Sequence, residues 1–400
     1  MGKKARFLFC VCLALCLSVY GKVCLAVFPS QPTFTIEDVS HPVWIEAGDL
    51  NGDSKPDLVV SSWVRKEGSG ESYDIDQSKI YIFYQNKGEY PSQPDKTLSV
   101  APNGLPRACA VGDFDNDGKG DLAVSSAGQF LCLFLGKEGL SVNHKFYDIN
   151  DYISTQRPSF GKMSKDGIMD FLVGPVWRKW MGGDKIQHGY FYGAKVNDAN
   201  PGLLADLNKD GALDAVFRRT NENVITIYYG PFSNMLVKTA DLSEYVELSA
   251  PLRVGDIAVG DLNGDGRPDI IASSAWNNDP GQRQIFIYYQ NVPIGFTANA
   301  EPSAVIEGIT GGIAVADFNK DGLTDFVVAE GAGDNPRTCI FYQKKGKGFA
   351  RSADEASETI SDYLAYSFKV VDINGDGYPD IVTTSVNENI VRGFIQTQKK

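Results

Sequence analysis

Short hydrophobic stretches recur along this 400-residue chain, and their composition is typical of β-strands. One unit shows the order: an apolar stretch at 257–260, a second at 270–274 and an aromatic one at 285–289. Such stretches are rich in β-branched and aromatic residues and are bounded by Gly, Asn, Asp and Pro, as strands are. Many are apolar on both faces, which predicts that neighbouring layers cover both sides. Because no stretch has a strong helical period, the sequence predicts an all-β fold.

A nine-residue acidic loop separates the first two stretches of each unit. Its seven copies begin at Asp49, Asp113, Lys162, Asp206, Asp261, Asp317 and Asp372. In the copy at 261–269, oxygen-bearing side chains stand at positions 1, 3, 5 and 9, and Gly266 is at position 6. That spacing surrounds a hard cation with oxygen ligands, so each loop is a candidate Ca²⁺ site. A repeat of roughly 45 to 65 residues is typical of solenoids, propellers and arrays.

A fourth, weaker strand precedes the next unit, as at 96–100 and 303–306. Four strands in each of seven units predict a seven-bladed β-propeller, whose radial sheets leave only short edges. Only two strands fit after Asp380, so a strand near 33–37 is predicted to complete the last blade and close the ring. An open solenoid is the alternative. Two units deviate, because the first has an insertion at 63–79 and the third is short and is expected to lack its outer strand.

The units resemble the FG-GAP and VCBS repeat family, which builds the N-terminal propeller of integrin alpha subunits. The resemblance covers all seven units and is nearly complete in the fifth and seventh. The third unit keeps Phe160-Gly161 and Gly174-Pro175, which are similar to the FG and GAP of the family name. The resemblance implies a seven-bladed propeller with calcium in the loops between the first and second strands of the blades. It implies less about activity, because one fold hosts unrelated functions.

Six of the loops carry the side-chain ligands that the resemblance implies, and a backbone carbonyl at position 7 is expected to complete each shell. These ligands are Asp49, Asn51, Asp53 and Asp57; Asp113, Asp115, Asp117 and Asp121; Asp206, Asn208, Asp210 and Asp214; Asp261, Asn263, Asp265 and Asp269; Asp317, Asn319, Asp321 and Asp325; and Asp372, Asn374, Asp376 and Asp380. Calcium is expected to brace the loops rather than to take part in catalysis. Ser54 stands where glycine is expected, which predicts a strained turn. Lys162 replaces the first ligand of the third loop and is predicted to pair with Asp166 and Asp170, so we expect no metal there.

The start of the chain predicts export from the cytoplasm. A basic head precedes an apolar run at 7–19, and small residues follow up to Ala26. This order is typical of a secretory signal, here at 1–26. It leaves one propeller domain at 27–400, which is expected to be secreted, periplasmic or on the cell surface. The apolar run is too short for a comfortable membrane span, and an uncleaved anchor is the alternative.

The net charge of the chain indicates which classes of partner it can bind. The formal net charge is −12, and removing the predicted signal, with four basic residues and no acid, takes it to about −16. Much of this acidity lies in the metal loops, which argues against nucleic acid as a partner.

Three cysteines, Cys109, Cys132 and Cys339, remain after removal of the predicted signal, and this odd number excludes a full disulfide framework. We expect three buried thiols.

The tryptophans suggest where a ligand binds. Trp63, Trp177 and Trp276 stand 14 or 15 residues after the start of their loops, which predicts that they lie at the end of the second strand. Trp44 and Trp180 are predicted to lie on the same side, opposite the calcium loops. Aromatic rings beside amides and carboxylates suit sugars or extended chains, whereas the alternative is that these rings pack between blades as core.

Catalytic signatures are missing from the sequence, since no nucleophile motif, zinc signature or phosphate loop occurs. His41, His144 and His188 occupy unrelated positions in their repeats. We therefore interpret the chain as a non-catalytic binding or scaffold module for a glycan or a protein. The alternative is a carbohydrate-active enzyme, a polysaccharide lyase or a glycoside hydrolase, with its site on the tryptophan-bearing face.

Overall fold

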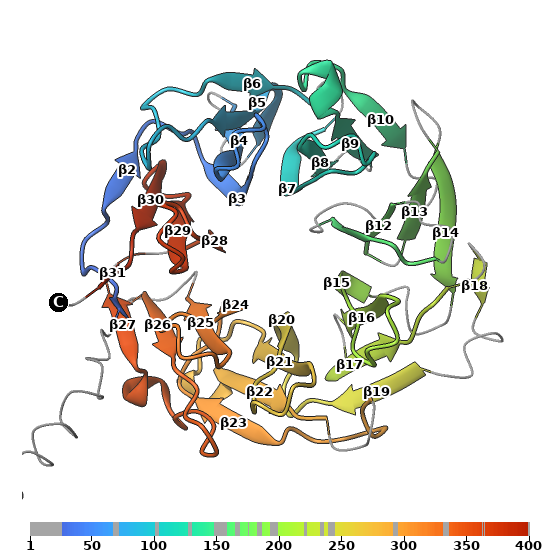
Figure 1. The fold of residues 1–400 in the computed structure, drawn as a ribbon, viewed down its shortest axis with the longest axis vertical. Coiled ribbons are helices and arrows are strands. Elements are labelled where there is room, and N and C mark those ends of the chain that lie inside the picture. Colours follow the sequence, from blue (N-terminus) through green and yellow to red (C-terminus); the bar gives the residue numbers. More distant parts are fainter. Residues whose placement is uncertain are drawn as a thin grey trace, which may run out of the picture.

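Seven sheets stand in a ring around a central axis, as Figure 1 shows. The ring confirms the predicted all-β, seven-bladed propeller. The structure is a computed structural model that describes residues 26–66, 72–100, 104–126, 130–147, 158–164, 169–174, 176–181, 186–192, 199–219, 222–232, 236–238, 245–290, 295–330, 336–361, 363 and 365–398. The predicted signal at 1–26 lies outside the described residues, except for Ala26.

The blades follow one another along the chain, each with its first strand nearest the axis. Blade 1 contains β3 (Pro42–Gly48), β4 (Asp57–Arg65), β5 (Tyr73–Phe83) and β6 (Lys96–Leu98). Blade 2 contains β7 (Pro106–Gly112), β8 (Asp121–Ser126), β9 (Phe130–Phe134) and β10 (His144–Tyr147). Blade 4 contains β15 (Ala199–Ala205), β16 (Asp214–Arg219), β17 (Val224–Tyr228) and β19 (Tyr245–Ser249).

The later blades repeat this order. Blade 5 contains β20 (Val254–Gly260), β21 (Asp269–Ser274), β22 (Gln284–Tyr288) and β23 (Ala304–Glu307). Blade 6 contains β24 (Gly312–Ala316), β25 (Asp325–Ala329), β26 (Arg337–Phe341) and β27 (Glu358–Ser361). Blade 7 contains β28 (Ser367–Val371), β29 (Asp380–Ser385), β30 (Ile390–Phe394) and, at its outer edge, β2 (Phe34–Ile36).

Blade 3 has more strands than the sequence predicts. It contains β11 (Ser159–Gly161), β12 (Asp170–Val173), β13 (Val176–Trp180) and β14 (Ile186–Tyr192), with β18 (Leu236–Lys238) as a fifth strand. The expectation that the third unit lacks its outer strand is therefore wrong. The unit is short because a tight turn joins β12 to β13, and β18, which follows β17 of blade 4 in the chain, pairs in parallel with β14.

Helical structure within the described residues is confined to three short 3₁₀ turns. They are η1 (Gly136–Glu138), η2 (Pro280–Gln282) and η3 (Ala353–Glu355). No helix among these described segments is long and apolar enough to cross a membrane.

Packing between blades explains why the second strands are apolar on both faces. Every residue of β8, β21 and β29 is buried. One face of such a strand packs on the preceding blade and the other on the following blade, so alternation of polar and apolar positions would leave a polar face without water. The three cysteines are buried free thiols in this core.

Glycines at the end of the inner strands allow neighbouring blades to approach closely. A Cβ on Gly48 would stand 2.6 Å from the side chain of Val111 in the next blade, and one on Gly112 would stand 2.5 Å from the ring of Phe160. Real Cβ atoms do not approach other atoms so closely. These positions therefore accept only glycine without a shift of the adjacent blade.

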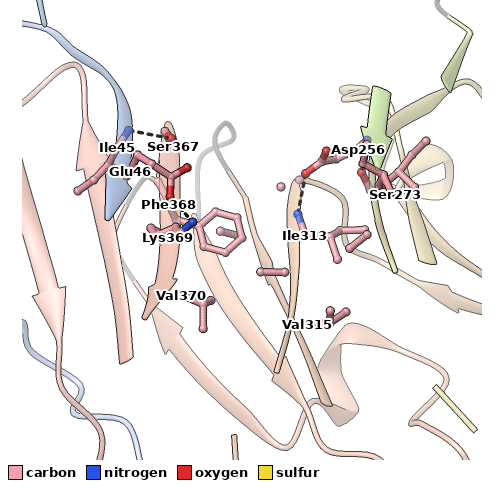
Figure 2. A pocket seen from close by; sticks show the side chains of 18 of the residues that line it. Ile45, Glu46, Asp256, Ser273, Ile313, Val315, Ser367, Phe368, Lys369 and Val370 are labelled. Carbon is pink, nitrogen blue, oxygen red and sulfur yellow. Dashed lines mark hydrogen bonds and ion pairs between the residues drawn. The ribbon is translucent and has the colours of Figure 1, made fainter. Parts of the chain in front are cut away.

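Two segments from opposite ends of the chain join blade 7 to the rest of the ring. Strand β2 pairs with β30, and the two-residue strands β1 (Ala26–Val27) and β31 (Thr397–Gln398) pair with each other. Phe28 is buried against Phe318, with ring centroids 5.9 Å apart. Between blades 7 and 1, Lys369 forms an ion pair with Glu46 in the wall of the central channel, as Figure 2 shows.

Candidate functional site

The acidic loops share one pattern of hydrogen bonds at the end where the first strand turns into the second. In six loops, the Asp at position 1 accepts the backbone N–H of position 6 through Oδ2. The side chain at position 3 accepts the N–H of position 5, and the Asp at position 5 accepts the N–H of position 7. Each side chain thus folds back onto its own loop, which brings the oxygens of positions 1, 3 and 5 together.

The aspartate at position 9 of each loop is buried and accepts hydrogen bonds from backbone N–H groups. It is fully buried in all seven units, and its Oδ2 accepts the backbone N–H of loop position 2 at 2.7–3.0 Å. In six units its Oδ1 accepts a backbone N–H that follows the third strand, also at 2.7–3.0 Å. This carboxylate therefore ties the loop, the second strand and the end of the third strand together.

Burial makes the ionised form of these position 9 carboxylates expensive. It raises the pKa of Asp57 to about 6, and the nearby carboxylates of Asp53 and Asp49 add to the rise. Burial likewise raises the pKa of Asp269 and of Asp325 to about 7. A cation in the loop would favour the ionised form, because opposite charge stabilises a carboxylate.

The donor set of these loops fits a hard divalent cation. In the second loop, carboxylate oxygens of Asp113, Asp115 and Asp117 all lie within 4.8 Å of one another. Three such charges repel one another unless a cation compensates them. Lys137 supplies part of that compensation, since its Nζ lies 2.5 Å from Asp115. The carboxylate at position 9 keeps a second lone pair on each oxygen, so it can still contribute to a shell of six to eight oxygens.

The turns of these loops depend on left-handed backbone. Position 6 has a φ between 81° and 86° in the five complete loops where it is glycine, and Ser54 has a φ of 64° in the first loop. A side chain in this region costs roughly 1–2 kcal/mol relative to glycine. The strained turn that the sequence predicts at Ser54 is therefore present.

The third loop holds a lysine from the sheet. Lys179 on β13 stands in register with Asp170 and donates from Nζ to Ser164 Oγ at 3.1 Å. Its side chain is almost fully buried, whereas Lys162 is exposed. The predicted pairing of Lys162 with Asp166 lies outside the described residues. Asp170 accepts the backbone N–H groups of Met163 and Ser164.

A central channel of about 1390 Å³ runs along the axis. The innermost strands of all seven blades line it, and apolar side chains such as Ile257, Val315 and Val370 form much of its wall. Figure 2 shows Glu46 and Lys369 on one side and Asp256 on another. Asp256 Oδ2 accepts the backbone N–H of Ile313 at 3.0 Å, which links blades 5 and 6.

The end of this channel opposite the acidic loops, named here the aromatic mouth, has polar and aromatic walls. It is formed by Trp44, Arg218, Asp256, Trp276 and Tyr366. Sequence reasoning found the two tryptophans but missed the other three residues. Arg218 and Asp256 were detectable as charges within otherwise apolar strands, whereas only the closed ring shows that they lie near one another.

Two of the five tryptophans are not where the sequence predicts. Trp177 is on the third strand, β13, where it is 1 % exposed and packs against Phe232. Trp180 is on the same strand, one residue beyond Lys179, which pairs with the ninth loop residue, Asp170. Its backbone is therefore at the acidic end of the blade. The prediction that all five tryptophans share the opposite face is wrong, because β13 begins directly after the tight turn and runs back towards the loops.

Of the remaining tryptophans, one is core and two line the channel. Trp63 is buried, donates from Nε1 to the carbonyl of Pro106 at 2.6 Å and has Arg107 over its ring at 4.6 Å. Trp44 on β3 is half-buried. Trp276, just after β21, is 38 % exposed and carries Arg283 on its ring at 4.1 Å. Of these three tryptophans, Trp44 and Trp276 are thus placed to meet a ligand.

Comparisons with known proteins agree with this architecture. The FG-GAP-like repeat family matches residues 206–272, 261–328 and 317–383. Phosphatidylinositol-glycan-specific phospholipase D of Rattus norvegicus is 30% identical over 193 residues, which cover 42% of this chain and 23% of that protein. The T-cell immunomodulatory protein homolog of Plasmodium yoelii yoelii is 24% identical over 298 residues, which cover 70% of this chain and 37% of that protein. The matches therefore span about a quarter and just over a third of these relatives.

Solved structures share the fold at low sequence identity. The BBS1N chain, solved in complex with ARL6DN, has a TM-score of 0.56 at 10% identity and covers 93% of this chain and 98% of its own length. Raptor of Chaetomium thermophilum has a TM-score of 0.57 at 10% identity, over 94% of this chain and 29% of its own length. At this identity the likeness concerns the fold alone.

Proposed function

Because the chain is an FG-GAP repeat propeller protein, we propose that it is a calcium-stabilised binding or scaffold module that acts outside the cytoplasm. The proposal rests on one observation, the division of chemistry between the two ends of the ring. One end carries six loops whose oxygen-bearing side chains fold back onto the loop, with three carboxylates close together in the second, and the other end carries exposed aromatic rings around a channel. The first end suits a structural cation, and the second suits a glycan or protein ligand.

Calcium in this proposal has a structural task. The side chains at positions 1, 3, 5 and 9 of the six complete loops would hold it. When bound, it supplies positive charge that offsets repulsion between the loop carboxylates. The chain itself already provides acceptors for the N–H groups of loop positions 2, 5, 6 and 7, so the cation would stabilise a turn that these hydrogen bonds have formed.

The partial matches to two different relatives support the proposal that this propeller is a module found in different proteins. A phospholipase D and an immunomodulatory protein homolog each match this chain over less than half of their own length. A module that occurs in proteins with different names is expected to bind a ligand or to orient the rest of the protein, rather than to catalyse one particular reaction. Export from the cytoplasm is proposed on the basic and apolar start of the sequence.

Two measurements test the proposal. Metal analysis of purified protein should find calcium, and chelation should lower the melting temperature, because a ligand that binds only the native state stabilises it. An array of glycans and candidate proteins should then identify a ligand whose binding falls after chelation. Protein that holds no calcium and melts unchanged after chelation would contradict the structural part. New chain ends on a bound glycan would contradict the non-catalytic part.

A further inference from the structure

The aromatic mouth presents two exposed aromatic rings at the entrance of the channel. Tyr366 is 56 % exposed and Trp276 is 38 % exposed, and both line the channel. They come from different blades, since Trp276 follows β21 of blade 5 and Tyr366 precedes β28 of blade 7. Arg283 covers part of the indole of Trp276, which holds the ring in place and leaves the rest accessible. Fixed aromatic rings offer contact area at low cost in side-chain entropy.

Two buried donors at this mouth lack an acceptor among the described residues. They are Nε1 of Trp44 and Nε of Arg218, and both residues line the channel. Another nitrogen of Arg218, an Nη, donates to the carbonyl of Val254 at 3.3 Å, which fixes the position of the guanidinium group. A buried donor without a partner is costly, so a ligand that brings acceptors gains from meeting these two groups.

Arginines gather at the end of the ring that carries the aromatic mouth. The chain has a net charge of −12, yet seven arginines lie at the end of the ring opposite the acidic loops. They are Arg65, Arg107, Arg218, Arg219, Arg253, Arg283 and Arg337. Several have carboxylate partners, such as Glu247 for Arg219 and Glu330 for Arg337. Around the mouth itself, Arg218 lies near the carboxylate of Asp256 and near the exposed Arg253, and Arg283 on the ring of Trp276 lies 3.9 Å from the carboxylate of Glu330.

Resting on the proposed function, we propose that the aromatic mouth binds an acidic oligosaccharide. Its pyranose rings stack on Trp276 and Tyr366, and a uronate carboxylate faces Arg218. The stacked rings favour a sugar over a peptide, because aromatic platforms beside a guanidinium and a carboxylate match a ring with hydroxyl and carboxylate groups. Arg218, the exposed Arg253 and the two donors without acceptors favour an acidic sugar over a neutral one.

The probes are hexamers of galacturonate and of hyaluronan, each compared with the same hexamer after reduction of its carboxyl groups. Isothermal titration at low and at physiological salt should show that the acidic hexamer binds at least about tenfold more tightly than its reduced form. Trp276→Ala and Tyr366→Ala should each weaken binding about tenfold. Arg253→Ala should weaken binding of the acidic form and leave that of the reduced form unchanged.

Matched controls separate a local loss from unfolding. Tyr245→Ala removes a similarly exposed ring from the outer strand β19, and Arg351→Ala removes an exposed arginine outside the channel. Both variants should bind as the parent chain does, and all variants should melt within about 4 °C of the parent chain in calcium.

Four results would overturn the inference: no binding of either acidic hexamer, equal binding of the reduced forms, unchanged binding in Trp276→Ala and Tyr366→Ala, or equal competition by a hexapeptide of glutamate. In each case a calcium-dependent protein or glycan ligand found on the array would leave the proposed function intact.

Discussion

The carboxylate of Asp325 accepts the backbone N–H of Phe318 at 3.0 Å through one oxygen, and that of Gln343 at 2.8 Å through the other. Asp325 is fully buried, so it fastens the sixth loop without any cation. Asp325→Ala leaves three N–H groups, those of Phe318, Asn319 and Gln343, without this acceptor. We expect it to lower the free energy of unfolding by about 2–4 kcal/mol in chelator, and by more in calcium, because the cation then loses a ligand as well.

The first position of the same loop provides the matched comparison. Asp317 accepts N–H groups of its own exposed turn, which water can satisfy after Asp317→Ala. This variant should cost about 1 kcal/mol or less in chelator and clearly more in calcium, because the cation is lost with its ligand. Urea unfolding of both variants, with and without chelator, checks the pair. An equal cost of Asp317→Ala in both conditions would show that the loop does not depend on calcium.

Ser54→Gly should stabilise the protein by roughly 0.5–1 kcal/mol. The φ of 64° at Ser54 is costly for a residue with a Cβ, whereas glycine adopts it freely and loses part of the gain through a more flexible unfolded chain. The control is Ser30→Gly at an exposed position outside the left-handed region, which should be neutral or slightly destabilising. Thermal melts in calcium compare the melting temperatures of both variants with that of the parent chain. A lower melting temperature for Ser54→Gly would contradict the assignment of strain.

Two tryptophans with similar sequence spacing should respond differently to truncation. Trp177→Ala removes a ring that is 1 % exposed, so we expect a loss of about 3–5 kcal/mol in the free energy of unfolding. Trp276→Ala removes a ring that is 38 % exposed and its stacking with Arg283, so we expect a loss of about 1 kcal/mol or less. Chemical denaturation measures both. Similar losses would mean that Trp276 is core and not free to meet a ligand.

Phe28 should anchor the N-terminal segment between blades 6 and 7. Its ring is buried against Phe318, and its backbone N–H donates to Glu358 at 2.9 Å. Phe28→Ala should lower the free energy of unfolding by about 2–4 kcal/mol, because a buried ring leaves a cavity. Val142→Ala, at a residue that is 45 % exposed, is the control and should change stability little. A neutral Phe28→Ala would show that this segment does not help to hold the ring closed.

The aromatic mouth and the fifth strand of blade 3 could not be predicted, because they depend on contacts between distant parts of the chain. Trp44, Arg218 and Tyr366 belong to three blades, and only closure of the ring places them around one channel. Strand β18 pairs with β14, although β15, β16 and β17 lie between them in the chain. Spacing along one unit carries no information about either contact.

The sequence by itself determined the strand order, the number of blades and the shape of the acidic loops. Each of these follows from local physics: strand composition acts over a few residues, and a loop such as 261–269 closes through its own side chains. The tertiary structure alone decided that Trp177 is core, that Trp276 remains exposed and that Lys179 reaches the third loop. The reason is that burial depends on which blade packs against each side chain, and that is fixed only when all seven sheets meet.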